Sequence, residues 1–374
     1  MSNNSWTYLD YAATTQVTKP VLDAMLPYFT VYFGNPSSIH GMGKEAKKAI
    51  TKARNQVAEA INAEPYQIIF TSGATEANTW VCKNSINILC SPIEHHSILN
   101  QPYATANQWG RIDGDVIMRE FPYPDTAGTD LISYMYVNNE TGLIQNVKEI
   151  CSLAHDYGMR FHTDATQAFG HLPIDVKDLN VDFMSLSGHK FHAPKGIGIL
   201  YVKKPHSLFP LFFGGGQEDK LRAGTESVAS IVGIGKAAEL YKYNKDKDLK
   251  IKKICKDYMI KFIMNNIPDV RINSINNGKN KYVNNILNIS IKDVESESLL
   301  IQMDMKGICI SGGSACNSGS LEPSHVVKEL HLPKEYEIGT VRFSFDETTT
   351  TEEIQYACHS LKTIVERLRK ARNK

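Results

Sequence analysis

Short apolar runs alternate with helix-like patterns through the first part of the chain. Runs rich in β-branched and aromatic residues recur between about residues 60 and 202, and a helical pattern at 147–157 separates two of them. Each run is bounded by turn-forming residues, which is typical of buried strands. Strands separated by helices predict βαβ units and a mostly parallel sheet. The expected strands are 68–70, 132–137, 160–163, 183–186 and 198–202.

Polar residues follow three of these expected strands. Asn139, Asp164 and Lys190 each come shortly after a strand has ended. In open α/β sheets, ligands bind beyond the carboxyl ends of the strands. We therefore expect these three side chains to belong to one shared site.

The pattern changes after Gly235. A long helical stretch at about 236–265 leads to β-like runs at 285–291 and 340–345, with helical patterns around them. This part is typical of a smaller α+β domain. The predicted division is a large domain at 11–245 and a small C-terminal domain at 246–374, with the N-terminal segment 1–10 packing against the small domain.

Composition narrows the class of protein. The 374 residues are 42% hydrophobic and carry a net charge of +1, so nothing indicates a nucleic-acid or membrane partner. The seven Cys residues form no CxxC pair, which argues against a disulfide framework and against a metal site. No apolar leader or run of 18 apolar residues occurs, so we expect a cytoplasmic protein.

Cys316 lies in a segment of small residues. The run 311–320 reads Ser-Gly-Gly-Ser-Ala-Cys-Asn-Ser-Gly-Ser, which favours an exposed, mobile loop over a core element. A thiolate carried on such a loop is a strong nucleophile that can travel. The alternative is a small buried Cys, the common fate of a free thiol.

Two of the strand-end residues have chemistry suited to an aldehyde cofactor. Lys190, in Ser-Gly-His-Lys, could form an imine with such a cofactor, although an ordinary surface lysine is the alternative. Asp164 could keep a pyridinium nitrogen protonated, as an electron-sink cofactor requires. Its alternative role is to cap the helix that follows.

Three further positions are weaker candidates when each is taken alone. The turn 72–75 opens a helix and could bind a phosphate through backbone N–H groups, as many helix starts could. His95 could stack on a ring or move protons, or could be a structural histidine. Arg342, flanked by apolar residues, could bind a carboxylate with two hydrogen bonds, or could belong to a structural ion pair.

Taken together, these motifs resemble the pyridoxal-phosphate (PLP) cysteine desulfurases of the nitrogen-fixation and iron–sulfur-cluster type, within the class-V aminotransferases. The resemblance extends over nearly the whole chain, and the joint order and spacing of the motifs make it specific. The matching segments are 8–15, 34–38, 71–76, 94–95, 137–140, 164–167, 187–190, 214–218, 222–225, 314–319 and 342–344.

The resemblance implies a fold and a role for each matching residue. The expected fold is α/β, the PLP-dependent transferase fold type I, with a mostly parallel seven-stranded sheet and a smaller α+β C-terminal domain. Lys190 would bind PLP covalently, His95 would stack on its ring and act in acid–base steps, and Cys316 would attack the substrate sulfur. Asp164 would contact the ring nitrogen, and Asn139 and Gln167 would contact the ring oxygen. The phosphate would be bound by Ala74, Thr75, Ser187, His189 and a second subunit's Thr225. The substrate carboxylate would be bound by Asn35 and Arg342.

The implied activity is removal of sulfur from L-cysteine, which gives L-alanine and a persulfide on Cys316. A sulfur-acceptor protein, in iron–sulfur cluster assembly or in tRNA or cofactor thiolation, would receive that sulfur, and the enzyme would be a homodimer. A selenocysteine lyase or another class-V PLP enzyme is the first alternative. A degenerate, non-catalytic sulfur carrier is the second, although it would be expected to lack Lys190, Asp164 or Cys316, all of which are present.

Overall fold

A seven-stranded sheet forms the centre of the larger of two lobes. The computed structural model describes residues 6–106, 128–276, 278, 280–312 and 323–372. At residues 243–248 it describes the backbone but not the side chains. The sheet is mostly parallel, as the sequence predicts. In spatial order its strands are β2 (Ile68–Thr71), β9 (Gly198–Val202), β8 (Phe183–Ser187), β7 (Arg160–Asp164), β5 (Leu131–Ser133), β3 (Ile88–Cys90) and β4 (Ala104–Ala106).

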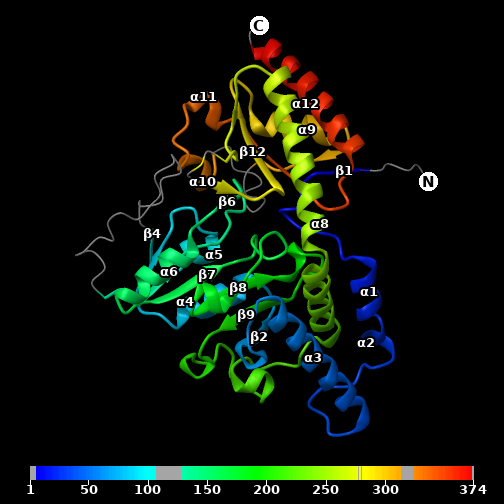
Figure 1. Ribbon diagram of the computed structural model, residues 1–374, viewed down its shortest axis with the longest axis vertical. Coiled ribbons are helices and arrows are strands. Elements are labelled where there is room, and N and C mark those ends of the chain that lie inside the picture. The colour runs from blue at the N-terminus through cyan, green and yellow to red at the C-terminus, as the bar shows by residue number, and fades with distance from the viewer. Residues whose placement is uncertain (1–5, 107–127, 277, 279, 313–322, 373–374) are drawn as a thin grey trace.

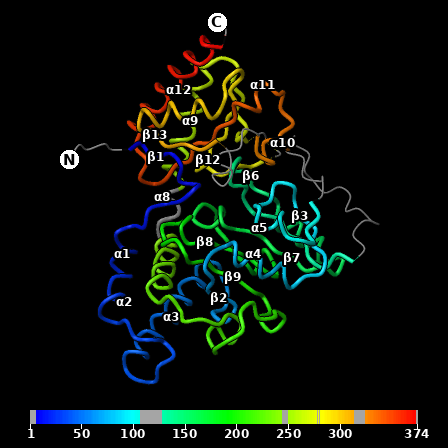
Figure 2. The backbone as a smooth tube through the Cα atoms, turned by 180° about the vertical axis from the view of Figure 1, so that it is seen from behind, coloured from blue at the N-terminus to red at the C-terminus, as the bar shows by residue number. Residues whose placement is uncertain are grey.

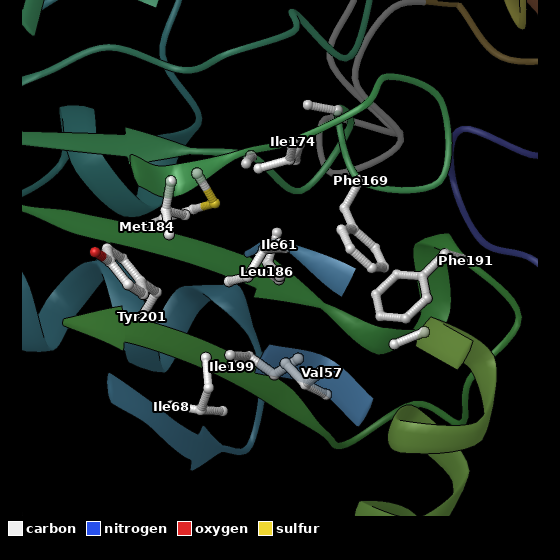
Figure 3. Close-up of a cluster of buried hydrophobic side chains, with 14 of the residues drawn as sticks. Val57, Ile61, Ile68, Phe169, Ile174, Met184, Leu186, Phe191, Ile199 and Tyr201 are labelled. Atoms are coloured by element: carbon white, nitrogen blue, oxygen red, sulfur yellow. The ribbon is translucent and has the colours of Figure 1, made fainter. Parts of the chain in front are cut away.

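Helix α3 (Gly41–Ala60) shows why the large lobe folds around this sheet. Its buried residues Ala46, Ile50, Ala53 and Val57 recur every three or four positions and form one apolar face. This face belongs to the main core together with residues of β2, β8 and β9, as Figure 3 shows for Val57 and Ile61 beside labelled strand residues. Further helices of this lobe are α1 (Lys19–Met25), α2 (Pro27–Thr30), α4 (Ala74–Lys83), α5 (His96–Leu99), α6 (Val147–Asp156) and α7 (Val176–Leu179).

The smaller lobe is built on an antiparallel sheet of three strands. β12 (Ile286–Ile291) lies between β10 (Val270–Ile272) and β14 (Thr340–Ser344). A separate hydrophobic core joins this sheet to helices α9 (Ser296–Asp304) and α12 (Thr351–Arg372). The other elements of this lobe are β11 (Lys281–Tyr282), α10 (His325–Lys328) and α11 (Lys334–Glu337). Strand β11 pairs with β6 (Leu143–Ile144), which belongs to the large lobe.

One long helix and the N-terminal strand connect the two lobes. Helix α8 (Val228–Asn266) runs along both lobes in Figure 1, and the predicted division after residue 245 falls inside it. Strand β1 (Thr7–Tyr8) pairs in parallel with β13 (Ile308–Cys309), so β1 lies against the small lobe, as Figure 2 shows from behind. None of the helices in the described ranges is long and apolar enough to cross a membrane.

Two element predictions need correction, and the direction of one strand was not predicted. Strand β9 runs antiparallel to both of its neighbours, because the connection from β8, residues 188–197, holds one 3₁₀ turn and no crossover helix. The strand expected at 132–137 ends at Ser133, since Val137 leaves the sheet to pair with Ile144. The helix expected from residue 236 begins at Val228, because its first two turns also pack into the main core.

Candidate active site

The carboxyl ends of β7 and β8 open onto a cavity of about 500 Å³. Its walls also include the start of α4, the segment after β5, the N-terminal segment and β14 of the small lobe. Asn139, Asp164 and Lys190, expected to share one site, all line it. The other predicted site residues on its walls are Ala74, Thr75, His95, Gln167, Ser187, His189 and Arg342.

Lys190 is presented by a tight turn directly after β8. Residues Gly188–Lys190 form a single 3₁₀ turn that begins directly after the last residue of β8. Lys190 is the last residue of this turn and is half-buried. Its Nζ donates to the carbonyl oxygens of Ala12 (2.7 Å) and Ala13 (2.8 Å). The amine is therefore held at the junction between the end of the sheet and the N-terminal segment.

Asp164 is the last residue of β7, and its buried carboxylate is fixed on both oxygens. Oδ1 accepts from the backbone N–H of Thr166 at 2.9 Å, and Oδ2 accepts from Asn78 Nδ2 at 2.7 Å. Asn78 also donates to Ser97 Oγ at 2.8 Å, so α4 and α5 both support this carboxylate. Asp164 thus caps a turn and lines the cavity as well, but the helix that the alternative interpretation expected it to cap is replaced by the turns at 166–171.

His95 caps the short helix α5. Its Nδ1 accepts from the backbone N–H of Ser97 at 3.1 Å, so the neutral ring carries its proton on Nε2. Burial lowers the pKa of His95, opposed in part by the charge of Asp164. The imidazole is therefore mainly neutral at pH 7 and can exchange a proton through Nε2.

The start of α4 forms a positive end of the cavity. Its N-cap is Gly73, which has no side chain to satisfy the first backbone N–H groups, and Ala74 and Thr75 line the cavity there. His189, nearby on the wall, pairs through Nδ1 with Thr14 Oγ1 at 3.1 Å. Burial, with Lys190 close by, lowers the pKa of His189 to about 4, so this ring is neutral. The backbone dipole is thus the main attraction for an anion at this end.

Five buried polar atoms of cavity-lining residues have no hydrogen-bond partner among the described residues. They are Glu140 Oε1, Thr166 Oγ1, Gln167 Oε1, His325 Nδ1 and Arg342 Nε. Gln167 is fixed through its Nε2, which donates to the carbonyl of Ala12 at 2.8 Å. Because an unpaired buried polar atom is costly, this group of atoms fits a site that binds a polar molecule.

Arg342 has partners on both of its terminal nitrogens. Nη2 lies 2.8 Å from Asp10 Oδ1, and Nη1 donates to the carbonyl of Asn139 at 2.6 Å. The side chain is almost fully buried between the N-terminal segment and the segment after β5. The ion pair of the alternative interpretation is therefore present, while the residue still lines the cavity.

Two predicted site residues within the described part of the chain do not join the cavity. Asn35 is exposed before α3, where its Oδ1 accepts from the backbone of Ser37. Thr225 is exposed and lines a separate hollow of about 90 Å³. Cys316 lies outside the described residues. The roles predicted for these three residues stay predictions.

Sequence reasoning missed several residues of the site. Asn78 supports Asp164, and its place one turn after Thr75 on the same helix was the only signal for it. His96 and His325 line the cavity with ring centroids 4.8 Å apart, although 229 positions separate them. A pairing across that distance leaves no local pattern in the sequence.

Comparison with known proteins identifies the family. The family model described as Aminotransferase class-V matches residues 7–357. The chain belongs to the class-V aminotransferase family. This result confirms the family predicted from the motifs. The match extends through both lobes and includes every residue of the cavity wall.

Class-V relatives cover almost the whole chain. A protein named cysteine desulfurase IscS from Dictyoglomus turgidum is 42% identical over 381 residues, which span 97% of this chain and 95% of that protein. A solved structure titled NifS-like protein superposes with a TM-score of 0.87 at 30% identity, covering 96% of this chain and 99% of that one. A second solved structure, titled SspA in complex with cysteine, superposes with a TM-score of 0.76 at 33% identity, covering 92% of this chain and 99% of that one. These neighbours confirm the predicted α/β fold.

Proposed function

We propose that this class-V enzyme is a PLP-dependent cysteine desulfurase. It takes sulfur from L-cysteine, leaves L-alanine, and carries the sulfur as a persulfide on Cys316 to an acceptor protein. The observation that carries the proposal is the single cavity shared by Lys190, Asp164 and the start of α4. The name of the relative from Dictyoglomus turgidum and the cysteine bound in the SspA structure support the same reaction.

The cavity suits PLP in size and in chemistry. Its 500 Å³ accommodates a small aromatic cofactor together with a bound amino acid. The start of α4 would hold the phosphate, Asp164 would pair with the ring nitrogen, and Lys190 would bind the aldehyde carbon. Gln167 Oε1, unpartnered and buried, would gain a partner near the ring. When bound, PLP supplies an electron sink for the carbon atoms of the substrate.

The chain's own residues orient the substrate and move its protons. Arg342, already paired with Asp10, would bind the carboxylate of L-cysteine through N–H groups of its guanidinium. His95, neutral at pH 7, would exchange a proton with the substrate. Asp164, held by Asn78 and Thr166, would keep a fixed negative charge under the ring nitrogen. Partial enclosure of the cavity strengthens these interactions by excluding water.

Sulfur transfer balances without an external oxidant. The thiolate of Cys316 attacks the substrate sulfur, an S–S bond forms, and the bond between that sulfur and the substrate's β-carbon breaks. The electron pair of the broken bond stays with the β-carbon, which takes up a proton and leaves in L-alanine. The predicted mobile loop around Cys316 would let the persulfide reach an acceptor.

The predicted homodimer is part of this proposal. Thr225 is exposed and does not reach the cavity of its own chain, which suits a residue that completes a second copy's site. Large apolar side chains are also exposed on the large lobe, among them Phe29, Phe33 and Phe213. Exposed aromatic residues of this kind are typical of a surface that a partner covers.

Two variants test the function. Lys190→Ala should lose the visible absorbance of the lysine-bound cofactor and all turnover, whereas Lys177→Ala, on an exposed lysine paired with Glu64, should keep both. A wild-type protein that neither contains PLP nor takes it up would contradict the proposal.

Cys316→Ser should separate cofactor chemistry from sulfur transfer, because a hydroxyl cannot replace a thiolate as acceptor at neutral pH. Mass spectrometry after incubation with L-cysteine should find a persulfide on Cys316 of the wild type and none in the variant. The matched control is Cys309→Ser, at a half-buried cysteine of β13. A persulfide on another cysteine, with Cys316→Ser still forming alanine, would show that the nucleophile is wrongly assigned.

A further inference from the structure

A group of four charged side chains lies next to the candidate active site. His192 Nε2 is 3.1 Å from Asp346 Oδ1 and 3.2 Å from Glu347 Oε1, and Lys252 Nζ is 3.5 Å from Glu347 Oε2. We call these residues the His192 cluster. Three of them, His192, Lys252 and Glu347, line a second cavity of about 200 Å³, which Lys190 also lines.

On the large lobe, the cluster holds the turn that follows Lys190. His192 comes two residues after Lys190 and has a φ of +70°, a conformation that needs support in a non-Gly residue. Its backbone N–H donates to Thr15 Oγ1 at 2.7 Å, and its Nδ1 donates to the carbonyl of Gln16 at 3.0 Å. The same N-terminal segment accepts from Lys190 at Ala12 and Ala13. The turn and this segment are therefore fastened together.

On the small lobe, the cluster holds the end of the strand that carries Arg342. Asp346 and Glu347 follow β14 directly. Asp346 is almost fully buried, and its backbone N–H donates to Thr349 Oγ1 at 2.9 Å, which fixes the turn. The ion pairs of His192 thus run from the Lys190 turn to the Arg342 strand.

The charges of the cluster balance within the chain. Burial alone would lower the pKa of His192, but its hydrogen bonds to Asp346 and Glu347 raise it to about 10. The two carboxylates therefore face two cations, His192 and Lys252. His171 Nδ1 lies 3.4 Å from Lys252 Nζ. Burial keeps the pKa of His171 well below its usual value, so this ring adds no charge to the cluster. With its own cations in place, the cluster has no need of a metal ion.

We propose that the His192 cluster is a positioning device that sets the placement of Lys190 relative to Arg342. His192 is then a positioning residue: it touches neither cofactor nor substrate, and acts through the turn after Lys190 and the end of β14. The inference rests on the proposed function, because it assigns Lys190 to the cofactor and Arg342 to the substrate carboxylate. Misplacement of such groups by about 1 Å can cost on the order of a hundred-fold in rate.

His192→Asn tests the proposal in the PLP-loaded enzyme. Asparagine tolerates a positive φ, so the turn keeps its backbone while the charge and the reach to the carboxylates are lost. We expect KM for L-cysteine to rise on the order of ten-fold or more, with a smaller fall in kcat, because the carboxylate contact is displaced. The pH titration of the lysine-bound cofactor's absorbance should shift as well. Asp346→Asn should also raise KM for L-cysteine. The double variant should have a KM close to that of the more impaired single variant, because both substitutions break the same contact.

The matched control is His155→Asn, in a histidine–carboxylate pair of the same lobe. His155 Nε2 lies 2.7 Å from Asp182 Oδ2, and neither residue lines the two cavities. Wild-type KM and absorbance titration in both His192→Asn and Asp346→Asn would overturn the proposal. If His192→Asn does not fold, the outcome is decided by Asp346→Asn and Glu347→Gln.

Hydrogen exchange in the cofactor-free protein separates this proposal from the function on which it rests. His192→Asn should raise exchange together at 12–16, 190–193 and 345–349, and unchanged exchange at these segments would overturn the coupling. A wild type that binds no PLP and forms no alanine would refute the proposed function, whatever the exchange result.

Discussion

Burial decides the charge of the histidines on the cavity wall. Burial lowers the pKa of His95, of His189 and of His325, so these rings are mainly neutral at pH 7. Neutral imidazoles can accept or donate a proton but add no positive charge. An anionic cofactor group would therefore be attracted by the start of α4 and by the lysines of the cavity wall, Lys190 and Lys195, instead of by these three histidines.

The pH dependence of turnover should report on His95. Since burial lowers the pKa of His95 below 6.5, the neutral ring predominates at pH 7, and the acid limb of kcat/KM for L-cysteine should lie below pH 6.5. His95→Gln should lower kcat by about a hundred-fold or more and remove that limb. Steady-state kinetics across pH would check this, with His359→Gln on the exposed face of α12 as the control. An acid limb that persists in His95→Gln would contradict the assignment.

Some residues of the site were predictable and others were not, for a physical reason. Lys190 and Asp164 stand at the carboxyl ends of strands, where the alternation of strand and helix gives their place in space. Asn78 and His325 act through partners far away in the chain, at Asp164 and at His96, and a single sequence carries no trace of such pairs. For Arg342 both a carboxylate-binding role and a structural ion pair were predicted as alternatives, but its partner Asp10 could not be predicted, because the pair depends on how the N-terminal segment packs.

At the scale of elements, the contact between β9 and the start of α4 sets the shape of the cavity. Gly198, the first residue of β9, lies so close to Gly73 that an added Cβ would be 2.5 Å from the Gly73 Cα. Both atoms involved belong to the backbone or are fixed to it, so no side chain can move aside. Only glycine at position 198 allows the N-cap of α4 to sit against the sheet.

Gly198→Ala should therefore weaken cofactor binding. The start of α4 must move, so we expect a loss of PLP affinity of about ten-fold and a loss of stability of about 1–3 kcal/mol. Titration with PLP and urea denaturation of the cofactor-free protein would measure the two effects. Gly41→Ala is the control, because nothing lies within 4 Å of its added Cβ. Wild-type PLP affinity in Gly198→Ala would contradict this account.

The sequence predicted most strands of the larger sheet and their mostly parallel direction, but not the direction of β9. Buried β-rich runs identified β7, β8 and β9 to within a residue. The reversal of β9 was missed, because apolar runs look alike in parallel and antiparallel strands. The early end of β5 was missed because Val137 is apolar in either setting and its partner Ile144 is chosen by tertiary packing.

For the whole molecule, the proposed homodimer gives a direct prediction. Phe33→Asp and Phe213→Asp place a charge on mostly exposed aromatic positions of the large lobe. If these positions are covered in a dimer, both variants should sediment as monomers and lose most turnover, since a buried unpaired charge is strongly unfavourable. Met305→Asp, at an equally exposed position of the small lobe, should leave the sedimentation unchanged. A wild type that is monomeric and fully active would contradict the prediction.

Helix α8 contributes residues to the hydrophobic cores of both lobes. Its first turns carry Ile231 and Ile234 into the core of the large lobe, and Met259 and Ile263 lie in the core of the small lobe. The 39 residues span about 58 Å, so unravelling either half would leave the other half as a frayed end with its apolar face exposed to water. The lobes should share one cooperative thermal transition, and neither should survive as an independent folded fragment after a cut within α8.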